Sequence, residues 1–182
     1  MASAVHFDVN ATLPLAEAVE SAVRCAREWD GASPLRVVVA LSAGLHEGRI
    51  AVAGGGASGG ALRTVTLEVR GPARRADEAH AATLRCDGAL GAVLDVSGSV
   101  FSSVVLRSLQ LRHDEGSHDG AVPAVRIGVD DGSDDAPPSG VRGVELVDCA
   151  VVGAVVLRVI SAACGGVDGD VSAVVARRCN FA

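Results

Sequence analysis

Aromatic residues are nearly missing from this sequence. They make up 2% of the 182 residues, with three phenylalanines, one tryptophan and no tyrosine. A wide core built around large rings is therefore excluded, and a sugar cleft lined by several tryptophan or tyrosine rings is disfavoured. Valine and alanine dominate the 49% of residues that are apolar. Because β-branched side chains fit a pleated surface, this composition favours strands around a narrow interior.

Lysine is absent too, and all 16 basic residues are arginine, which we attribute to coding bias. The 22 acidic residues leave a net charge of −6. This balance excludes the phosphate backbone of nucleic acid as a partner. It also disfavours anionic polysaccharide, although net charge does not rule out a local basic cleft.

Long apolar runs are missing as well, so no membrane span is expected. Residues 1–10 lack the basic and apolar regions of a secretory signal, and we expect a cytoplasmic protein.

The five cysteines are an odd number without a C-x-x-C pair, which indicates neither a disulfide framework nor a zinc site. The cysteines are expected to be buried free thiols.

One amphipathic helix is predicted at residues 12–30. Thr12 could cap its N-terminus, and Leu15, Val19, Val23 and Ala26 recur on one face at helical spacing. Because an isolated helix of this length is marginal in water, the apolar face is expected to cover the end of a larger structure.

Short valine-rich strings dominate the rest of the chain. One series begins near positions 37, 65, 104, 144 and 174, and a second near 50, 93, 125 and 155. Cys149 and Cys179 lie thirty residues apart in matching segments. Loose periodicity of this kind is typical of stacked β-structure. We therefore predict a single domain, 1–182, with stacked coils over 35–182 and each series in its own parallel sheet.

These patterns distinguish three architectures. A β-sandwich should alternate apolar and polar residues and use tight hairpins, whereas several strings here are continuously apolar. Alternating βαβ units need helical connectors, and these connectors are glycine-rich and polar. A parallel β-solenoid is favoured, with a β-sandwich as the alternative.

The opening arrangement of the chain resembles right-handed parallel β-helix proteins of the pectin lyase-like superfamily, and the resemblance spans nearly the whole chain at the level of pattern. The resemblance lies in the helix at 15–29, the strand, glycine turn and second strand at 35–50, and the strand at 65–72. It implies an all-β right-handed parallel β-helix of about four to five coils with an N-terminal capping α-helix. The superfamily's enzymes act on pectin through Asp, Arg or calcium-binding carboxylates, but this sequence matches none of those motifs residue for residue.

Two polar segments are the weak candidates for chemistry. His113, Asp114, His118 and Asp119 could transfer protons or bind a metal, although their spacing fits no defined motif. The second segment offers carboxylates for calcium but lacks the spacing of an EF-hand; it contains Asp130, Asp131, Asp134 and Asp135. For both segments, a solvated loop is the preferred interpretation. No cofactor is therefore expected, and calcium bound by the second segment is the alternative.

The preferred function is therefore a non-catalytic β-helix module that presents a flat face to a protein or a glycan. The alternative is a carbohydrate-active enzyme, of lyase or esterase type, with its site on inserted loops. The sequence runs to Ala182 without a polar capping element, so the C-terminal end is expected to be uncapped or truncated. End-to-end association through that open coil is the expected mode of self-assembly.

Overall fold

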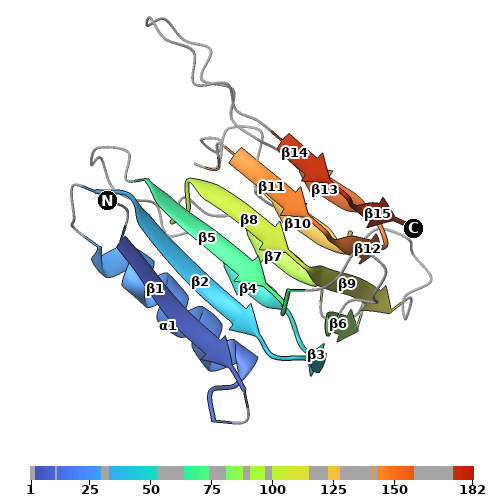
Figure 1. The fold of residues 1–182 in the computed structure, drawn as a ribbon, viewed down its shortest axis with the longest axis horizontal. Helices are drawn as coiled ribbons and strands as arrows, with labels where there is room; N and C mark the ends of the chain where they lie inside the picture. The colour runs from blue at the N-terminus through green and yellow to red at the C-terminus, as the bar shows by residue number, and fades with distance from the viewer. Residues whose placement is uncertain are drawn as a thin grey trace, which may run out of the picture.

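A computed structural model places one α-helix at the end of a set of parallel sheets (Figure 1). It describes residues 3–10, 12–29, 33–52, 64–73, 81–87, 91–96, 100–114, 123–127, 141, 143–157 and 174–182. The strand-rich, solenoid-like architecture expected from the valine-rich strings is confirmed.

The described strands form three sheets, and neighbouring strands in each sheet run parallel. The six-stranded sheet contains β1 (Ser3–Val9), β2 (Leu35–Leu41), β5 (Val65–Arg70), β8 (Ser103–Arg107), β11 (Gly143–Val147) and β14 (Val174–Arg177). The five-stranded sheet contains β3 (Gly44–Glu47), β6 (Ala82–Asp87), β9 (Leu109–Asp114), β12 (Ala150–Val152) and β15 (Asn180–Phe181). The four-stranded sheet contains β4 (Ile50–Val52), β7 (Leu94–Val96), β10 (Val125–Ile127) and β13 (Val155–Leu157).

From β2 onward the chain visits the sheets in a fixed order: six-stranded, five-stranded, four-stranded, then six-stranded again. We call each set of three successive strands a coil. The first predicted series of strands forms β2, β5, β8, β11 and β14, and the second forms β4, β7, β10 and β13. Each series lies in one parallel sheet, so this prediction is confirmed.

Matching valines and leucines stack from coil to coil on the inward side of the six-stranded sheet. One inward row is Val5, Val37, Leu67, Val104, Val144 and Val174, and the next is Phe7, Val39, Val69, Leu106, Leu146 and Ala176. The four central members of each row are at most 2% exposed. Stacking of equivalent aliphatic side chains fills most of a narrow interior, and few aromatic rings are needed, as the composition predicts.

The five-stranded sheet was not predicted. Residues 104–111 and 144–151 each appear in the sequence as one continuous strand, but Ser108 and Asp148 adopt φ angles of 54° and 53° and divide them. Arg178 does the same in the last coil, with φ 53°. A left-handed residue turns the chain sharply, so the residues after it enter a second sheet.

Side chains at these corners also contact one another. Arg178 donates two hydrogen bonds to the Asp148 carboxylate, one of them 2.7 Å from Nη2 to Oδ2, and this partner raises the pKa of Arg178. Cys149 and Cys179 follow the corners on adjacent coils, as predicted, and both are free thiols. Burial raises the pKa of Cys149 to about 11, which keeps the thiol protonated and unreactive.

The helix α1 (Leu15–Glu28) covers the N-terminal end of the stack, where it contacts β1, β2 and β4. Its buried face consists of Leu15, Ala18, Val19, Ala22 and Ala26, while Val23 is only half-buried. The end-covering role is confirmed, but the predicted boundaries 12–30 are too wide. Pro14 takes the N-cap position in place of Thr12, because Asn10 Oδ1 already accepts the backbone N–H groups of Thr12 and Leu13.

The strand β1 was also missed, although it carries a clear signal. Val5, Phe7 and Val9 alternate with the exposed His6 and Asp8, which is the two-residue period of a half-buried strand. β1 pairs in register with β2 and adds an edge strand beside the helix.

Candidate functional site

The outward side of the six-stranded sheet carries charged side chains from five coils. Because side chains alternate across a strand, residues between the inward rows point away from the interior. We call this surface the charged face; its ionisable residues are His6, Asp8, Arg36, Glu68, Arg70, Arg107, Glu145 and Arg177. Figure 1 views the molecule with this sheet toward the reader.

Glu68 is the centre of the charged face. It is 3% exposed although it points outward, because arginines from the strands on both sides lie against it. Arg36 Nε lies 2.6 Å from Glu68 Oε2, and Arg107 Nε lies 3.7 Å from Oε1. A buried carboxylate is costly to desolvate unless it is paired, and these two guanidinium groups supply the opposite charge beside it.

The ion-pair network continues toward the next coil. Arg107 Nη2 donates to Glu145 Oε2 at 3.4 Å. Arg36, Glu68, Arg107 and Glu145 therefore form a chain of alternating charge across β2, β5, β8 and β11. Its members are only one-third to one-half exposed, apart from the buried Glu68. The network fixes the guanidinium groups in space and so prepares a rigid polar surface.

Arg70 differs from its neighbours. It sits next to Arg107 in register, is half-buried, and has no ion pair or hydrogen bond from its side chain within the described ranges. On its other side, Ala40 of β2 separates it from Asp8 of β1. Because the alanine side chain is small, the surface between the Arg70 guanidinium and the exposed Asp8 carboxylate is not filled by a side chain of β2.

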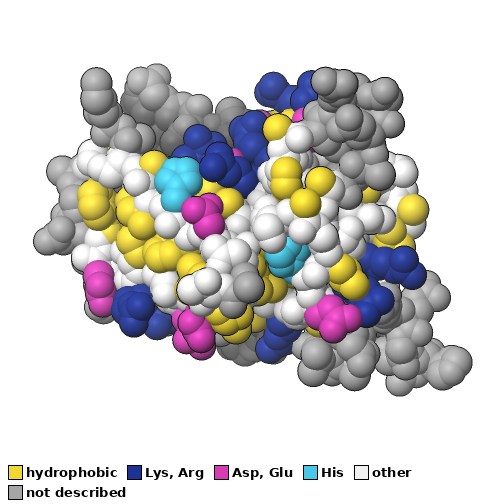
Figure 2. All heavy atoms as spheres, turned by 60° about the horizontal axis from the view of Figure 1, so that its bottom comes forward, with side chains coloured by type: hydrophobic (Ala, Val, Ile, Leu, Met, Phe, Trp, Pro, Cys, Tyr) yellow, Lys and Arg dark blue, Asp and Glu magenta, His cyan; other side chains and the backbone are white. Residues whose placement is uncertain are grey.

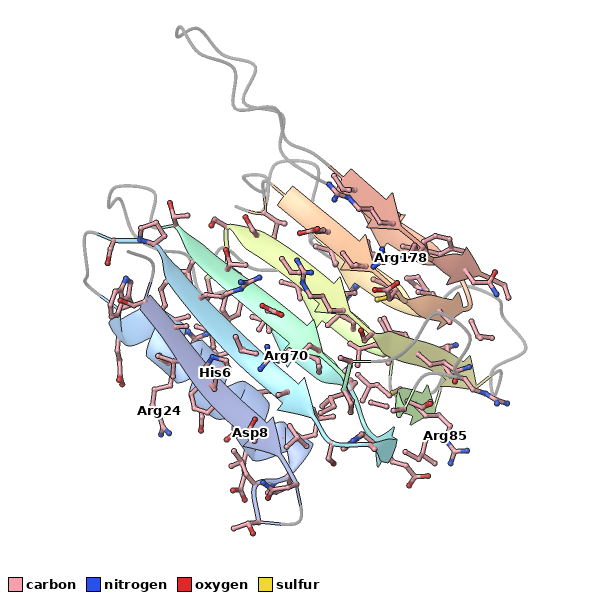
Figure 3. All side chains as sticks on the ribbon, viewed as in Figure 1. His6, Asp8, Arg24, Arg70, Arg85 and Arg178 are labelled. Atoms are coloured by element: carbon pink, nitrogen blue, oxygen red, sulfur yellow. The ribbon has the colours of Figure 1, made fainter. Side chains whose placement is uncertain are left out.

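The figures place these residues together on one surface. Figure 3 shows His6 and Asp8 on β1 and Arg70 on β5, on the same side of the sheet. Figure 2 shows Lys and Arg side chains gathered near a histidine and an acidic side chain at the surface. The arrangement offers Arg70 as a donor for a planar anion, with the paired Arg107 on one side and the small Ala40 on the other.

The residues that the sequence predicts for proton transfer or metal binding are not among those of the charged face. His113 is in β9 of the five-stranded sheet, half-buried, next to Cys86 in register, and its Nε2 is buried without a hydrogen-bond partner. Asp114 occupies the last position of β9, beside Asp87 of β6, but its side chain lies outside the described residues.

The remaining predicted candidates, His118, Asp119, Asp130, Asp131, Asp134 and Asp135, lie outside the described residues. Within the described ranges, no three His, Cys, Asp or Glu side chains are grouped closely enough to hold a metal ion.

The described surface also carries two further ion pairs and two hollows, none of which has the charge arrangement of the charged face. Asp95 and Arg126 form a largely buried ion pair on the four-stranded sheet, and Arg85 pairs with Glu47 at 2.5 Å on the five-stranded sheet. Two open hollows of about 500 and 360 Å³ flank α1, and Arg24 and Glu28 line both. None of these combines a buried charge with an unpaired one, as the charged face does.

The charged face was missed because its residues come from different coils. Arg36, Glu68, Arg107 and Glu145 are separated by 32 to 39 positions, and no local motif joins them. The signal becomes visible only after the strands are aligned coil by coil, when each strand shows a charge at an outward position.

Comparison with protein-family models, curated proteins and solved structures finds no match for this chain. Within the described residues, the helix is too short and too polar to cross a membrane. The geometry of the charged face is thus the basis on which a function can be argued.

Proposed function

We propose that the chain is a right-handed parallel β-helix similar to the pectin lyase-like superfamily. The support is the fixed order in which the chain visits three parallel sheets through four full coils. Right-handedness follows from the strong preference of connections between parallel strands of one sheet. The helix at one end matches the capping helix that the resemblance implies.

The function that the geometry supports best is a non-catalytic binding module for an acidic glycan on the charged face. The observation that carries it is the half-buried Arg70, which lacks a partner while its neighbour in register, Arg107, is paired. A guanidinium held at a surface without an internal partner is a ready donor for a carboxylate. Glu68 and Glu145, by contrast, are engaged by arginine, so these two carboxylates favour positioning over proton transfer.

Recognition by charge also fits the composition. The chain has few rings on which sugars could stack, so affinity has to come from hydrogen bonds and ion pairs. Strands follow one another at about 4.8 Å, and a polymer lying across them would meet the outward side chains of successive coils. The net charge of −6 disfavours polyanions at long range, but the local cluster of arginines opposes that effect at contact distance.

We predict that the protein binds oligogalacturonate and that Arg70→Gln weakens this binding about tenfold. The loss of one charge-assisted hydrogen bond is worth roughly 1.5 kcal/mol, which corresponds to this factor. Isothermal calorimetry with oligogalacturonate and with a neutral glucan of similar length measures the effect. Binding of the acidic glycan should also weaken as salt is added.

The matched control is Arg24→Gln, which removes the same charge from an exposed residue of α1 (Figure 3). It should leave the affinity unchanged. If wild-type protein binds neither glycan, or if Arg24→Gln weakens binding as much as Arg70→Gln, the proposed site is wrong.

A further inference from the structure

Both edges of the six-stranded sheet are open within the described residues. β1 pairs only with β2, and β14 pairs only with β11. An uncovered strand edge presents a row of unpaired N–H and C=O groups, which is a template for pairing with another chain. At the β14 end two large apolar side chains are also exposed, Val174 at 51% and Phe181 at 50%.

The free backbone groups of the two edges are complementary. Ser3 N donates to Pro34 O, so Ser3 and alternate residues after it face β2, while Ala4, His6 and Asp8 face the free edge. Arg177 O accepts from Asp148 N, so Arg177 faces β11. By the same alternation, Val174 and Ala176 face the free edge of β14.

A parallel junction between the edges can therefore repeat the bonding found inside the sheet. There, Ser3 aligns with Leu35 and donates to the residue before it. If Val174 aligns with Val5 of a second copy, Val174 N meets Ala4 O and Val174 O meets His6 N. Ala176 N and O then meet His6 O and Asp8 N of that copy, so each of these bonds uses groups that face a free edge.

This register also matches the side chains. On the outward side Arg177 lies beside Asp8 of the second copy, which places opposite charges together on exposed strands. On the inward side Val174 continues onto Val5, and Ala176 onto Phe7. The two inward valine-rich rows thus run through the junction, and the exposed Val174 becomes covered.

We propose that this chain associates with itself head to tail, with β14 of one copy pairing in parallel with β1 of the next. Helix α1 lies behind β1, on the inward side of the sheet, and leaves the edge of β1 accessible (Figure 1). The contact joins two different surfaces, so it does not close by twofold symmetry and extends as a linear series of copies. It engages Asp8 and Arg177 at the two ends of the charged face, leaves the exposure of the central residues Glu68, Arg70 and Arg107 unchanged, and does not depend on the glycan proposal.

The test is sedimentation velocity of the full chain, from dilute solution to about 300 µM, a range that reveals interfaces of modest affinity. Wild-type protein is expected to sediment faster as concentration rises, without a fixed dimer endpoint. Asp8→Arg and Arg177→Asp should each raise the concentration of half-association at least tenfold, because each brings like charges together. An equimolar mixture of these two variants should associate again, since every junction between the two unlike copies joins opposite charges.

The control Arg112→Asp makes the same charge change on an exposed residue of the central strand β9 and should sediment as wild type. Thermal unfolding establishes whether each variant is folded. A variant that is not folded is replaced by the neutral Asp8→Asn or Arg177→Gln. Each neutral variant is expected to weaken association several-fold. Wild-type protein that stays monomeric throughout would overturn the proposal. So would variants that associate as wild type does, or a mixture that fails to recover association.

Discussion

Replacement of Ala18 by aspartate is expected to lower the free energy of unfolding by about 4 kcal/mol. Ala18 is 0% exposed, on the face of α1 that covers the end of the stack, between the buried Leu15 and Ala22. A carboxylate at this position would be buried without a partner and would also crowd the interface. Thermal unfolding followed by circular dichroism should give a midpoint lower by about 8 to 16 °C.

Ala16→Asp is the matched control for this experiment. Ala16 is exposed in the first turn of the same helix, where a negative charge interacts favourably with the helix dipole. This variant should unfold at or slightly above the wild-type temperature. If the two variants have equal midpoints, α1 does not cover the stack in the way described.

A single methyl group at Gly71 is expected to cost about 2 to 3 kcal/mol of stability. A Cβ atom built on Gly71 would lie 2.4 Å from Ser108 O and 3.0 Å from the Cβ of Ala82. The first neighbour is a backbone atom of the next coil, so the clash cannot be relieved by a side-chain rotation. Gly71→Ala should therefore force two coils apart at the corner between the six-stranded and five-stranded sheets, which denaturant unfolding can measure.

Ser108→Gly is the opposite substitution at the equivalent corner one coil later. Ser108 has φ 54°, a conformation that glycine adopts without steric cost. This variant should be as stable as wild type or slightly more stable. A Gly71→Ala variant of unchanged stability would contradict the register between β5 and β8 on which the whole stack depends.

The strands were predictable where the sequence repeats its apolar pattern. Strings such as those beginning at Val37, Val65 and Val104 recur at the same point of successive coils, and the structure places them in one sheet. The five-stranded sheet was not predictable in the same way. A single residue in a left-handed conformation separates β9, β12 and β15 of this sheet from the strand that precedes each of them. Serine and arginine rarely adopt that conformation, so their presence in a sequence does not predict it.

The charged face was beyond local sequence reasoning for a different reason. Glu68 looks like an ordinary exposed strand residue until Arg36 and Arg107 are seen to lie on either side of it. Dense clusters such as His113-Asp114 attract attention because sequence analysis detects residues that are close along the chain. In a stacked fold, side chains that act together are separated by a whole coil, so they must be sought at equal positions in successive repeats.

The charged face as a binding surface is the central claim, and an NMR titration tests it most directly. Oligogalacturonate added to labelled protein should shift the amide signals of Thr66, Glu68, Arg70 and Arg107 in proportion to the bound fraction. The signals of α1 should remain in place, although two hollows flank that helix. Shifts confined to α1 or to the five-stranded sheet, or no shifts at saturating glycan, would contradict the assignment of the binding surface.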